Sequence, residues 1–261
     1  MQHKARKRFG QNFLHDPSVI DNIVNTFHPA PGEHVVEIGP GLGAMTRPLL
    51  LSCKSLDVIE LDRDLIEHLE THVAPLGDLR IHNCDVLKFD FSSLGVNKNS
   101  LRVIGNLPYN ISTPLIFHLI DSLELVQDMC FMLQKEVVER LVAKPGSKEY
   151  GRLSVMVQYY CDVEKLFTIG PGAFKPAPKV DSAIVYLQPR KTIEPAAIDT
   201  QQFAKIVTAA FAHRRKTLRN NLKHLLNESD YQHCTIDPAN RAETLSVNDF
   251  VCLANRFSET Q

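Results

Sequence analysis

Val35-Val36-Glu37-Ile38-Gly39-Pro40-Gly41-Leu42-Gly43 is the stretch of this sequence that decides its fold. A short apolar run passes into a glycine-rich turn and then into a helical pattern, as where a buried strand leads into a helix. Glycines at such a turn let the backbone bend sharply and let a ligand approach it closely. Nicotinamide and flavin enzymes use similar loops, and structural turns also carry glycines, so the loop alone does not name a ligand.

Strand-length apolar runs recur through the first two-thirds of the chain, at Leu56–Leu61, Leu79–Cys84, Leu101–Ile104 and Cys130–Leu133. Helical patterns separate most of them. One helix is expected to begin at Asp16-Pro17 and another at Thr113-Pro114, because each pair places a capping side chain before a proline. The alternation predicts an α/β protein with a parallel sheet covered by helices on both faces. Val180–Leu187 alternates like an edge strand.

The rest of the chain is predicted to be helical, after a break at Gln188-Pro189-Arg190-Lys191. Apolar residues at helical spacing form one stripe: Phe203, Ile206, Val207, Ala210 and Phe211. Ser246-Val247-Asn248-Asp249 resembles a capping box. We therefore expect an α/β domain over residues 1–189, which begins with a basic segment over 1–15, and a small helical domain over 190–261.

The composition is that of an ordinary globular protein, with 44% hydrophobic and 23% charged residues. No stretch approaches the ~20 apolar residues needed to cross a membrane, and the basic N-terminus lacks the apolar run of a secretory signal. A cytoplasmic protein is therefore expected. The six cysteines are scattered without zinc-ligand spacing, which predicts packed, reduced thiols and neither a disulfide framework nor a metal site.

Polar residues or glycines directly follow the apolar runs, at Gly39, Glu60, Asp85 and Asn106. Ligands of open α/β sheets bind beyond the carboxyl ends of the strands, so these positions are expected to share one crevice. Glu60 is suited to accept hydrogen bonds from both ribose hydroxyls of an adenosine cofactor, and Asp85 to hold the amine of its adenine. Solvated loop acids are the alternative.

The spacing of the loop glycines favours a cofactor without phosphate. Gly39, Gly41 and Gly43 form a Gly-x-Gly-x-Gly pattern rather than Gly-x-Gly-x-x-Gly, and the loop has no Lys or Arg to meet a pyrophosphate. S-adenosylmethionine is therefore favoured over a dinucleotide.

Asn106-Leu107-Pro108-Tyr109 is the predicted chemical site. An aromatic amine is a weak nucleophile but a methyl sulfonium is a strong electrophile, so two oxygen acceptors that orient the amine can suffice. The side-chain carbonyl of Asn106 and the backbone carbonyl of Leu107 or Pro108 are suited to this role. The Tyr109 ring offers a face for the target base. Because Asn cannot act as a general base, we expect catalysis by positioning; the alternative is a Pro-Tyr turn after a strand.

A target base must leave its stack to enter such a pocket, and a second aromatic side chain would then close a sandwich. Phe174 is the candidate, because prolines stiffen the segment Phe174-Lys175-Pro176-Ala177-Pro178-Lys179-Val180 that presents it. The alternative, a core phenylalanine in a proline-rich connection, is the one favoured by position alone.

Basic residues are clustered although the net charge is −1. One cluster precedes the first acid and consists of Lys4, Arg6, Lys7 and Arg8. The other contains no acid and consists of Arg214, Arg215, Lys216, Arg219 and Lys223. Local clusters on a near-neutral chain suit a surface that binds phosphate at defined places. A solvated helix face is the alternative.

Together these motifs resemble the KsgA-type ribosomal RNA adenine dimethyltransferases. Besides the glycine loop, Glu60 and Asp85, the resemblance rests on four longer stretches, Gln11–Leu14, Asn106–Pro114, Phe174–Ser182 and Arg214–Asn220. It spans nearly the whole chain, in order and at family-like spacing, without a departure at a motif position.

The resemblance implies a Rossmann-like, class I S-adenosylmethionine-dependent methyltransferase domain with a small all-helical C-terminal domain. It implies cofactor contacts by Asn12, Leu14, Gly39, Glu60, Asp85 and Asn106. The implied substrate is a pair of adjacent adenosines in the hairpin loop near the 3′ end of small-subunit (16S) ribosomal RNA. Each would be methylated twice within a 30S assembly particle, which implies a role in small-subunit biogenesis.

Under this resemblance both basic clusters become RNA contacts, and the N-terminal one is expected to order on binding. A monomer is expected. Three alternatives stay open: an erythromycin-resistance-type enzyme that dimethylates 23S ribosomal RNA, a DNA adenine methyltransferase, and a non-catalytic ribosome-assembly or transcription factor on the same fold. The Arg214–Asn220 run and the long C-terminal tail favour the small-subunit enzyme over the first.

Overall fold

The computed structural model describes residues 12–260 of the chain. The chain divides into two compact units, the first formed by Met1–Val138 and Glu164–Pro189, the second by Glu139–Val163 and Arg190–Gln261. The sequence analysis placed residues 139–163 in the first domain. In the structure their helix α6 (Arg152–Tyr160) contacts α7 (Thr200–Ala210) and α10 (Val247–Glu259) of the second unit instead.

The first unit contains a seven-stranded sheet with the order β4-β3-β2-β5-β6-β9-β7. Its strands are β2 (His34–Ile38), β3 (Ser55–Glu60), β4 (Asp78–Asn83), β5 (Leu101–Asn106), β6 (Val126–Gln134), β7 (Cys161–Ile169) and β9 (Ser182–Pro189). The pairs from β4 to β6 are parallel, and β9 runs antiparallel to β6. The parallel core that the sequence predicts is therefore present.

One strand prediction was wrong, and one strand was not predicted. The segment expected to be an edge strand forms β9, which lies between β6 and β7. It is covered on both faces, since five of its eight residues are buried or nearly so. The edge is formed by β7, whose alternating exposed and half-buried residues carry too little apolar signal to be recognised.

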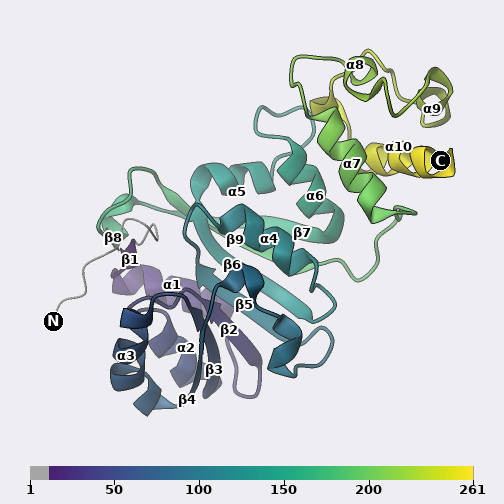
Figure 1. The fold of residues 1–261 in the computed structure, drawn as a ribbon. Coiled ribbons are helices and arrows are strands. Elements are labelled where there is room, and N and C mark those ends of the chain that lie inside the picture. Colours follow the sequence, from purple (N-terminus) through teal and green to yellow (C-terminus); the bar gives the residue numbers. More distant parts are fainter. Residues whose placement is uncertain (1–11, 261) are drawn as a thin grey trace. The chain divides into compact units, whose positions relative to one another are not determined.

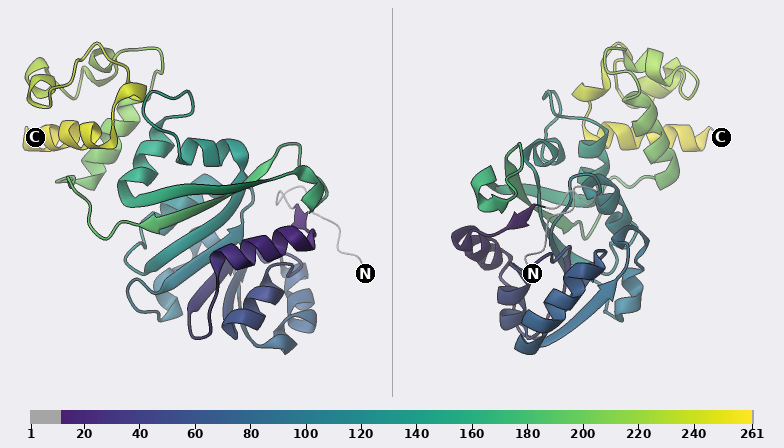
Figure 2. Two further views of the ribbon diagram at one scale, coloured as in Figure 1. Left: turned by 180° about the vertical axis from the view of Figure 1, so that it is seen from behind. Right: turned by 60° about the vertical axis from the view of Figure 1, so that its left-hand side comes forward.

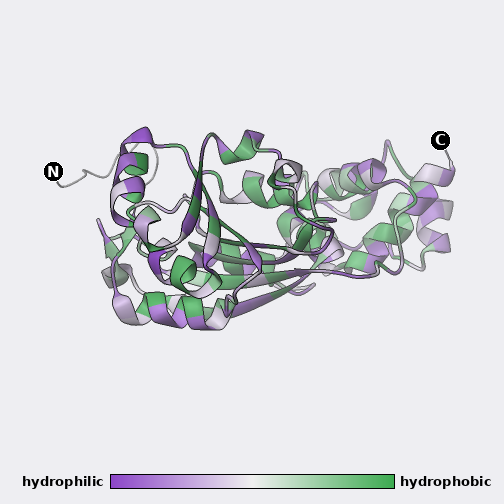
Figure 3. Cartoon of the chain, turned by 90° about the horizontal axis from the view of Figure 1, so that it is seen from below, coloured by the Kyte–Doolittle hydropathy of each residue, from purple (hydrophilic) through white to green (hydrophobic). Residues whose placement is uncertain are grey.

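Helices cover both faces of this sheet, with α4 in front of it in Figure 1 and α1 in front of it when seen from behind in Figure 2. The helices are α1 (Pro17–Phe27), α2 (Thr46–Cys53), α3 (Arg63–His72), α4 (Ser112–Ile120) and α5 (Lys135–Leu141). Short 3-10 turns are η2 (Ala74–Leu76), η3 (Val86–Lys88), η4 (Phe91–Leu94) and η5 (Pro171–Ala173). Green and purple segments alternate along the helices in Figure 3, as expected for helices with one buried face.

The predicted start of α1 is confirmed, because the Asp16 carboxylate accepts hydrogen bonds from the Ser18 and Val19 amides. The predicted Thr113 cap of α4 is wrong. The N-cap is Ile111, two residues earlier, so that the helix begins at Ser112; the Ile111 amide donates a hydrogen bond to the Pro108 carbonyl.

A second, two-stranded sheet pairs β1 (Phe13–Leu14) antiparallel with β8 (Phe174–Lys175). Two residues are too few for a periodic signal, so the sequence did not predict it. This pairing brings the start of the described chain beside the proline-rich segment.

The second unit consists of α6, α7, α8 (Leu218–Leu222), α9 (Glu228–His233), η6 (Ala242–Thr244) and α10. The predicted stripe on α7 is buried at Phe203, Ile206, Val207 and Ala210. The predicted capping box is confirmed, since Ser246 and Asp249 bond each other's backbone amides at the start of α10.

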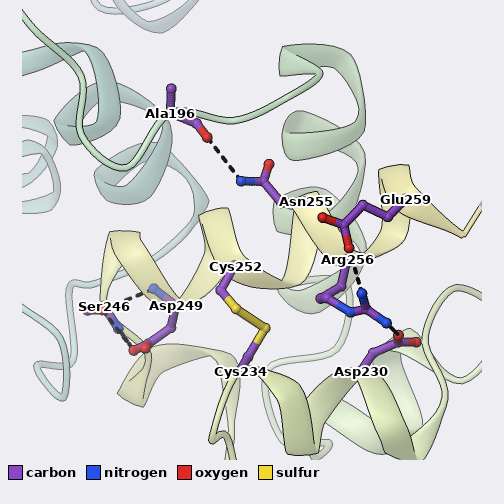
Figure 4. The surroundings of a disulfide bond; sticks show 9 residues. All are labelled: Ala196, Asp230, Cys234, Ser246, Asp249, Cys252, Asn255, Arg256 and Glu259. Carbon is purple, nitrogen blue, oxygen red and sulfur yellow. Dashed lines mark hydrogen bonds and ion pairs between the residues drawn. A yellow bond between two sulfur atoms is a disulfide. The ribbon is translucent and has the colours of Figure 1, made fainter.

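A disulfide between Cys234 and Cys252 corrects the expectation that all cysteines are thiols. It joins the end of α9 to α10, with Cα atoms 5.8 Å apart (Figure 4). The two cysteines are separated by 18 positions and belong to no spacing motif, and only the packing of α9 against α10 brings them together. Cys53, Cys84, Cys130 and Cys161 are free.

Among residues 12–260, no helix is long and apolar enough to span a membrane. The same part of the chain has no group of three or more His, Cys, Asp or Glu side chains arranged to hold a metal ion.

Candidate active site

The principal pocket of the first unit lies at the carboxyl ends of β2, β3 and β5. The strand order reverses here, because the chain builds β3 and β4 on one side of β2 and β5 and β6 on the other. Crevices at such switch points are the usual ligand sites of open α/β sheets. Gly39, Glu60, Asp85 and Asn106 all line this pocket, so the structure brings together the four positions singled out by sequence.

The glycine loop forms one wall of the pocket. Gly39 and Gly41 have φ angles of 69° and 58°, a left-handed region that side chains disfavour. A Cβ on Gly41 would lie 3.2 Å from the Phe13 ring, so the loop is also tightly covered by β1. Gly43 does not line the pocket, and a Cβ there would meet Val73 at 2.8 Å. Its role in the structure is packing.

Glu60 links the glycine loop to the turn after β3. Its carboxylate accepts hydrogen bonds from the Asp62 amide at 2.8 Å and the Gly41 amide at 3.3 Å. Burial raises the pKa of Glu60, whereas these amide hydrogen bonds act in the opposite direction. The carboxylate is thus fixed in position before any ligand enters. Asp85 is held similarly, because one of its oxygens accepts from the Leu87 amide at 3.0 Å.

Glu37 is a pocket residue that the sequence analysis did not single out. It is 1% exposed, and within residues 12–260 neither of its carboxyl oxygens has a hydrogen-bond partner. Burial raises its pKa to about 8; the Thr46 side chain acts against this rise, and the nearby Glu60 adds to it. An acid inside an apolar strand run was the available signal. A buried, unpartnered carboxyl group beside a pocket suits a positively charged ligand.

The charges of the pocket fit S-adenosylmethionine. Three carboxyl groups line it, those of Glu37, Glu60 and Asp85, whereas no Lys, Arg or His among residues 12–260 does. A pyrophosphate would find no cation here and would face three acids. A sulfonium nucleoside with an amino group suits the same wall, because it is positively charged and carries ribose hydroxyls for Glu60.

The Asn106 amide is oriented by the start of the described chain. Its Nδ2 donates a hydrogen bond to the Asn12 carbonyl at 3.1 Å. A backbone carbonyl can only accept, so the nitrogen of the amide must face Asn12 and the oxygen must face away from it. Asn106 Oδ1 is therefore left as an acceptor on the pocket wall.

The structure distinguishes between the two backbone carbonyls proposed as the second acceptor. The Pro108 carbonyl already accepts a hydrogen bond from the Ile111 amide at 3.1 Å. The Leu107 carbonyl has no donor within the described chain, and its own amide is held by the Met132 carbonyl at 3.2 Å. Because only the Leu107 carbonyl is without a donor, Leu107 is favoured over Pro108 as the second acceptor.

Tyr109 lines the pocket and its hydroxyl lies 3.2 Å from Ser182 Oγ. Ser182 begins β9 and is 1% exposed. The contact limits rotation of the Tyr109 ring, which is what a stacking surface for a base requires. Nothing in the sequence pattern indicated Ser182, because the two residues meet only through the sheet.

Gly105 was also missed. A Cβ at this position would lie 2.6 Å from the Ile38 carbonyl, closer than real Cβ atoms come. Glycine therefore lets β5 approach β2 closely just before Asn106.

Phe174 does not line this pocket, and its stacking on the target base stays a prediction. It is 4% exposed and belongs to the hydrophobic core. The physical reason is strand alternation: pairing of β8 with β1 turns Phe174 inward and Lys175 outward. The favoured alternative, a core phenylalanine, describes this geometry.

The second basic cluster is exposed, but its members differ. Arg214 and Arg219 pair with Glu243 and Glu228, at 3.2 and 3.1 Å. Within residues 12–260 no acid pairs with the three others, Arg215, Lys216 and Lys223. Lys4, Arg6, Lys7 and Arg8 lie outside the described residues.

A parallel-cored sheet with a glycine loop, an acid at the end of the second of its strands and an acid-lined pocket at its switch point is typical of a class I S-adenosylmethionine-dependent methyltransferase. Comparison with known proteins agrees with this class. The chain belongs to the ribosomal RNA adenine dimethylase family, whose model matches residues 2–259. The family resemblance, the fold class, the enzyme class and the cofactor predicted from sequence are thereby confirmed.

Individual relatives place the chain further within the family. It is 54% identical over 258 residues to ribosomal RNA small subunit methyltransferase A of Pseudomonas fluorescens, covering 99% of this chain and 95% of that protein. The crystal structure of a dimethyladenosine transferase from Plasmodium falciparum matches with a TM-score of 0.82 and 27% identity, over 95% and 98% of the two chains. The 23S rRNA methyltransferase ErmE matches with a TM-score of 0.73 over 95% and 100%, but at 22% identity it supports the fold alone.

Proposed function

We propose that this enzyme dimethylates the exocyclic amines of two adjacent adenosines in the 3′-terminal hairpin loop of small-subunit ribosomal RNA. The proposal is supported by the family and by the name of a relative that is 54% identical over almost the whole chain. The observation that carries it is the orientation of the Asn106 amide, whose oxygen is available to accept from an amine.

The residues of the chain act by binding and orienting. S-adenosylmethionine supplies an electrophilic methyl group when bound, and Glu60, Asp85 and the glycine loop are the residues suited to hold it. Asn106 Oδ1 and the Leu107 carbonyl accept the two amine hydrogens and so direct the nitrogen lone pair toward that methyl group. Tyr109 stacks on the adenine. Asn106 takes no proton, because an amide is not a base; the methylated amine is strongly acidic and releases its proton to water.

RNA binding is assigned to the basic clusters. The second cluster is exposed on the second unit, and the first, Lys4 to Arg8, is proposed to order on RNA. We further propose that the enzyme acts in the cytoplasm on a 30S assembly particle. It is proposed to act as a monomer, because two adjacent adenosines can be reached in turn by a single active site.

The erythromycin-resistance-type reaction is the second candidate, because such enzymes share much of the Asn-x-Pro-Tyr and glycine-loop pattern of this chain. A non-catalytic role in subunit assembly is compatible with the same clusters and does not depend on Asn106.

Methyl mapping tests the proposal. Undermethylated small subunits and purified large subunits are each incubated with the enzyme and S-adenosylmethionine, and the modified nucleotides are located by mass spectrometry. We expect four methyl groups on two adjacent adenosines of the small-subunit RNA and none on the large subunit. Methylation of large-subunit RNA alone would support the second candidate and refute the first.

A further inference from the structure

Two loops of the second unit lie side by side although they are far apart in the sequence (Figure 1). Residues 142–151 connect α5 to α6, and residues 211–217 connect α7 to α8. The Gly146 amide in the first loop donates to the Glu243 carbonyl of η6 at 2.7 Å. The Arg214 guanidinium in the second loop donates to the Lys148 carbonyl of the first.

Arg214 connects three segments at once. Besides the Lys148 carbonyl, its guanidinium binds the Glu243 carboxylate, with Nε and Oε2 3.2 Å apart. A planar guanidinium can hold two partners in fixed directions, which a lysine ammonium does not do. Arg214 therefore joins the 142–151 loop, the 211–217 loop and η6.

Aromatic rings anchor the ends of the same two loops. Tyr150, near the end of the first loop, is 2% exposed and lies edge-on to Phe211, which begins the second, with ring centroids 6.3 Å apart. Phe211 in turn packs on Phe250 of α10 at 5.6 Å. The loops are thus held at their bases by packing and across their middles by Arg214.

This arrangement gathers four exposed cations, Lys144 and Lys148 from the first loop and Arg215 and Lys216 from the second, which we call the cationic edge. Within residues 12–260, none of the four forms an ion pair. The one acid in these loops, Glu149, is also exposed. Arg214, by contrast, already has an acidic partner.

We propose that Arg214 positions the cationic edge rather than binding phosphate itself, and that Lys144 and Lys148 join Arg215 and Lys216 as phosphate contacts of ribosomal RNA. This inference rests on the proposed function, which supplies the RNA. Unpaired, exposed cations on neighbouring loops release counterions when they meet phosphates, whereas a guanidinium held by a carboxylate has less to gain.

Substitution of Glu243 distinguishes a net-charge effect from a positioning role of Arg214, because the two predict opposite changes in RNA affinity. If the cluster acts only through net charge, Glu243→Gln removes a negative charge and RNA binding tightens. If Arg214 holds the loops, the same change releases it and weakens binding to undermethylated small subunits by about two- to fivefold, as expected for a surface ion pair. Glu228→Gln is the matched control, because its partner Arg219 does not reach the 142–151 loop; it should leave binding unchanged or tighter.

Two further variants complete the design. Arg214→Lys keeps the charge but cannot hold both partners, so it should weaken binding as Glu243→Gln does. Lys144→Gln with Lys148→Gln should lower the slope of log Kd against log salt by between about one and two. Melting temperatures of all variants, measured in parallel, confirm that each is folded.

The failures are distinguishable. If the wild-type enzyme neither binds nor methylates small subunits, the proposed function is wrong. If it does both, but Glu243→Gln binds as tightly as Glu228→Gln or the lysine variants keep the wild-type salt slope, the proposed function stands and this inference is overturned.

Discussion

The pocket of the first unit and the cationic edge of the second handle charge in opposite ways. Glu37 and Glu60 are 1% and 7% exposed, and Glu60 is fixed by backbone amides. The four cations of the edge are exposed and unpaired within the described residues. Salt screens the interactions of buried charged groups only weakly, and such groups select a ligand by its geometry. Salt screens the interactions of exposed charged groups strongly, and such groups attract any phosphate. One enzyme thus separates a selective cofactor site from a tolerant RNA surface.

The largest expected effect lies on the pocket side of this comparison. Asn106→Ala removes an oriented acceptor and should lower kcat by roughly 10²-fold, the scale seen when one preorganised polar group is removed. Single-turnover methylation of small subunits measures it. RNA affinity should not change, since the second unit is untouched.

Asn110→Ala is the matched control for Asn106→Ala. Asn110 is exposed on the same pocket loop and has no recorded side-chain hydrogen bond among the described residues. We expect less than a threefold change in kcat, which is less than about half of the ~1.4 kcal/mol that a tenfold change represents. Equal losses in both variants would contradict positioning by Asn106.

Gly105→Ala should damage the pocket through the backbone. The added Cβ would lie 2.6 Å from the Ile38 carbonyl, so β5 must move away from β2. Overpacking of this kind costs about 1–3 kcal/mol, and both the melting temperature and kcat should fall. Gly146→Ala is the control for adding a methyl group to a glycine with open space around it, although its φ of 86° makes a small loss of stability expected there too. Full activity of Gly105→Ala would show that the close approach of the strands is dispensable.

Reversing the charge of residues on the cationic edge should weaken RNA binding and leave the cofactor pocket unaffected. Arg215→Glu with Lys216→Glu should weaken RNA binding and lower the salt slope by about two, one for each lost phosphate contact. Cofactor affinity, measured by calorimetry, should stay constant. Lys191→Glu changes an exposed cation of the same unit outside both loops, and an equal loss there would mean that binding reflects net charge alone.

The smallest effect is a pH dependence set by Glu37. Its pKa is raised to about 8 in the folded chain from an ordinary 4.5, so the folded state holds the proton more tightly. Stability from this group is present below about pH 4.5 and is lost as the pH rises through about 8. Without cofactor, Glu37→Gln should therefore melt a few degrees higher than wild type above pH 8, since ~1 kcal/mol corresponds to about 2–4 °C.

The same two proteins should converge toward pH 5, where Glu37 is neutral in the folded state and mimicked by glutamine. Scanning calorimetry across this range checks the sign. Parallel melting curves from pH 5 to 9 would mean that Glu37 is ionised throughout, with a partner that lowers its pKa.

The sequence predicted those parts of the site that depend on local pattern. A glycine loop after an apolar run, and a polar residue at the end of each of the next strands, are read along the chain, so Gly39, Glu60, Asp85 and Asn106 were found together. The direction of the Phe174 ring could not be predicted, because its short segment has no periodic pattern; the ring is buried where β8 pairs with β1. The contact of Gly43 with Val73 could not be predicted either, since Val73 lies much later in the chain, at the end of α3.

By itself, the sequence determined the α/β class, the strand–loop–helix unit that holds the cofactor, the family, and the presence of an Asn-Leu-Pro-Tyr site. The fold class follows from short-range periodicity. The family and the site follow from motifs whose residues suit this reaction and few others. Only the tertiary structure decided which end of the Asn106 amide faces the pocket, that Ser182 contacts Tyr109, that Cys234 meets Cys252, and that Arg214 joins two loops. Each of these is a contact between residues distant in the chain, and its geometry is set by packing, which no local pattern encodes.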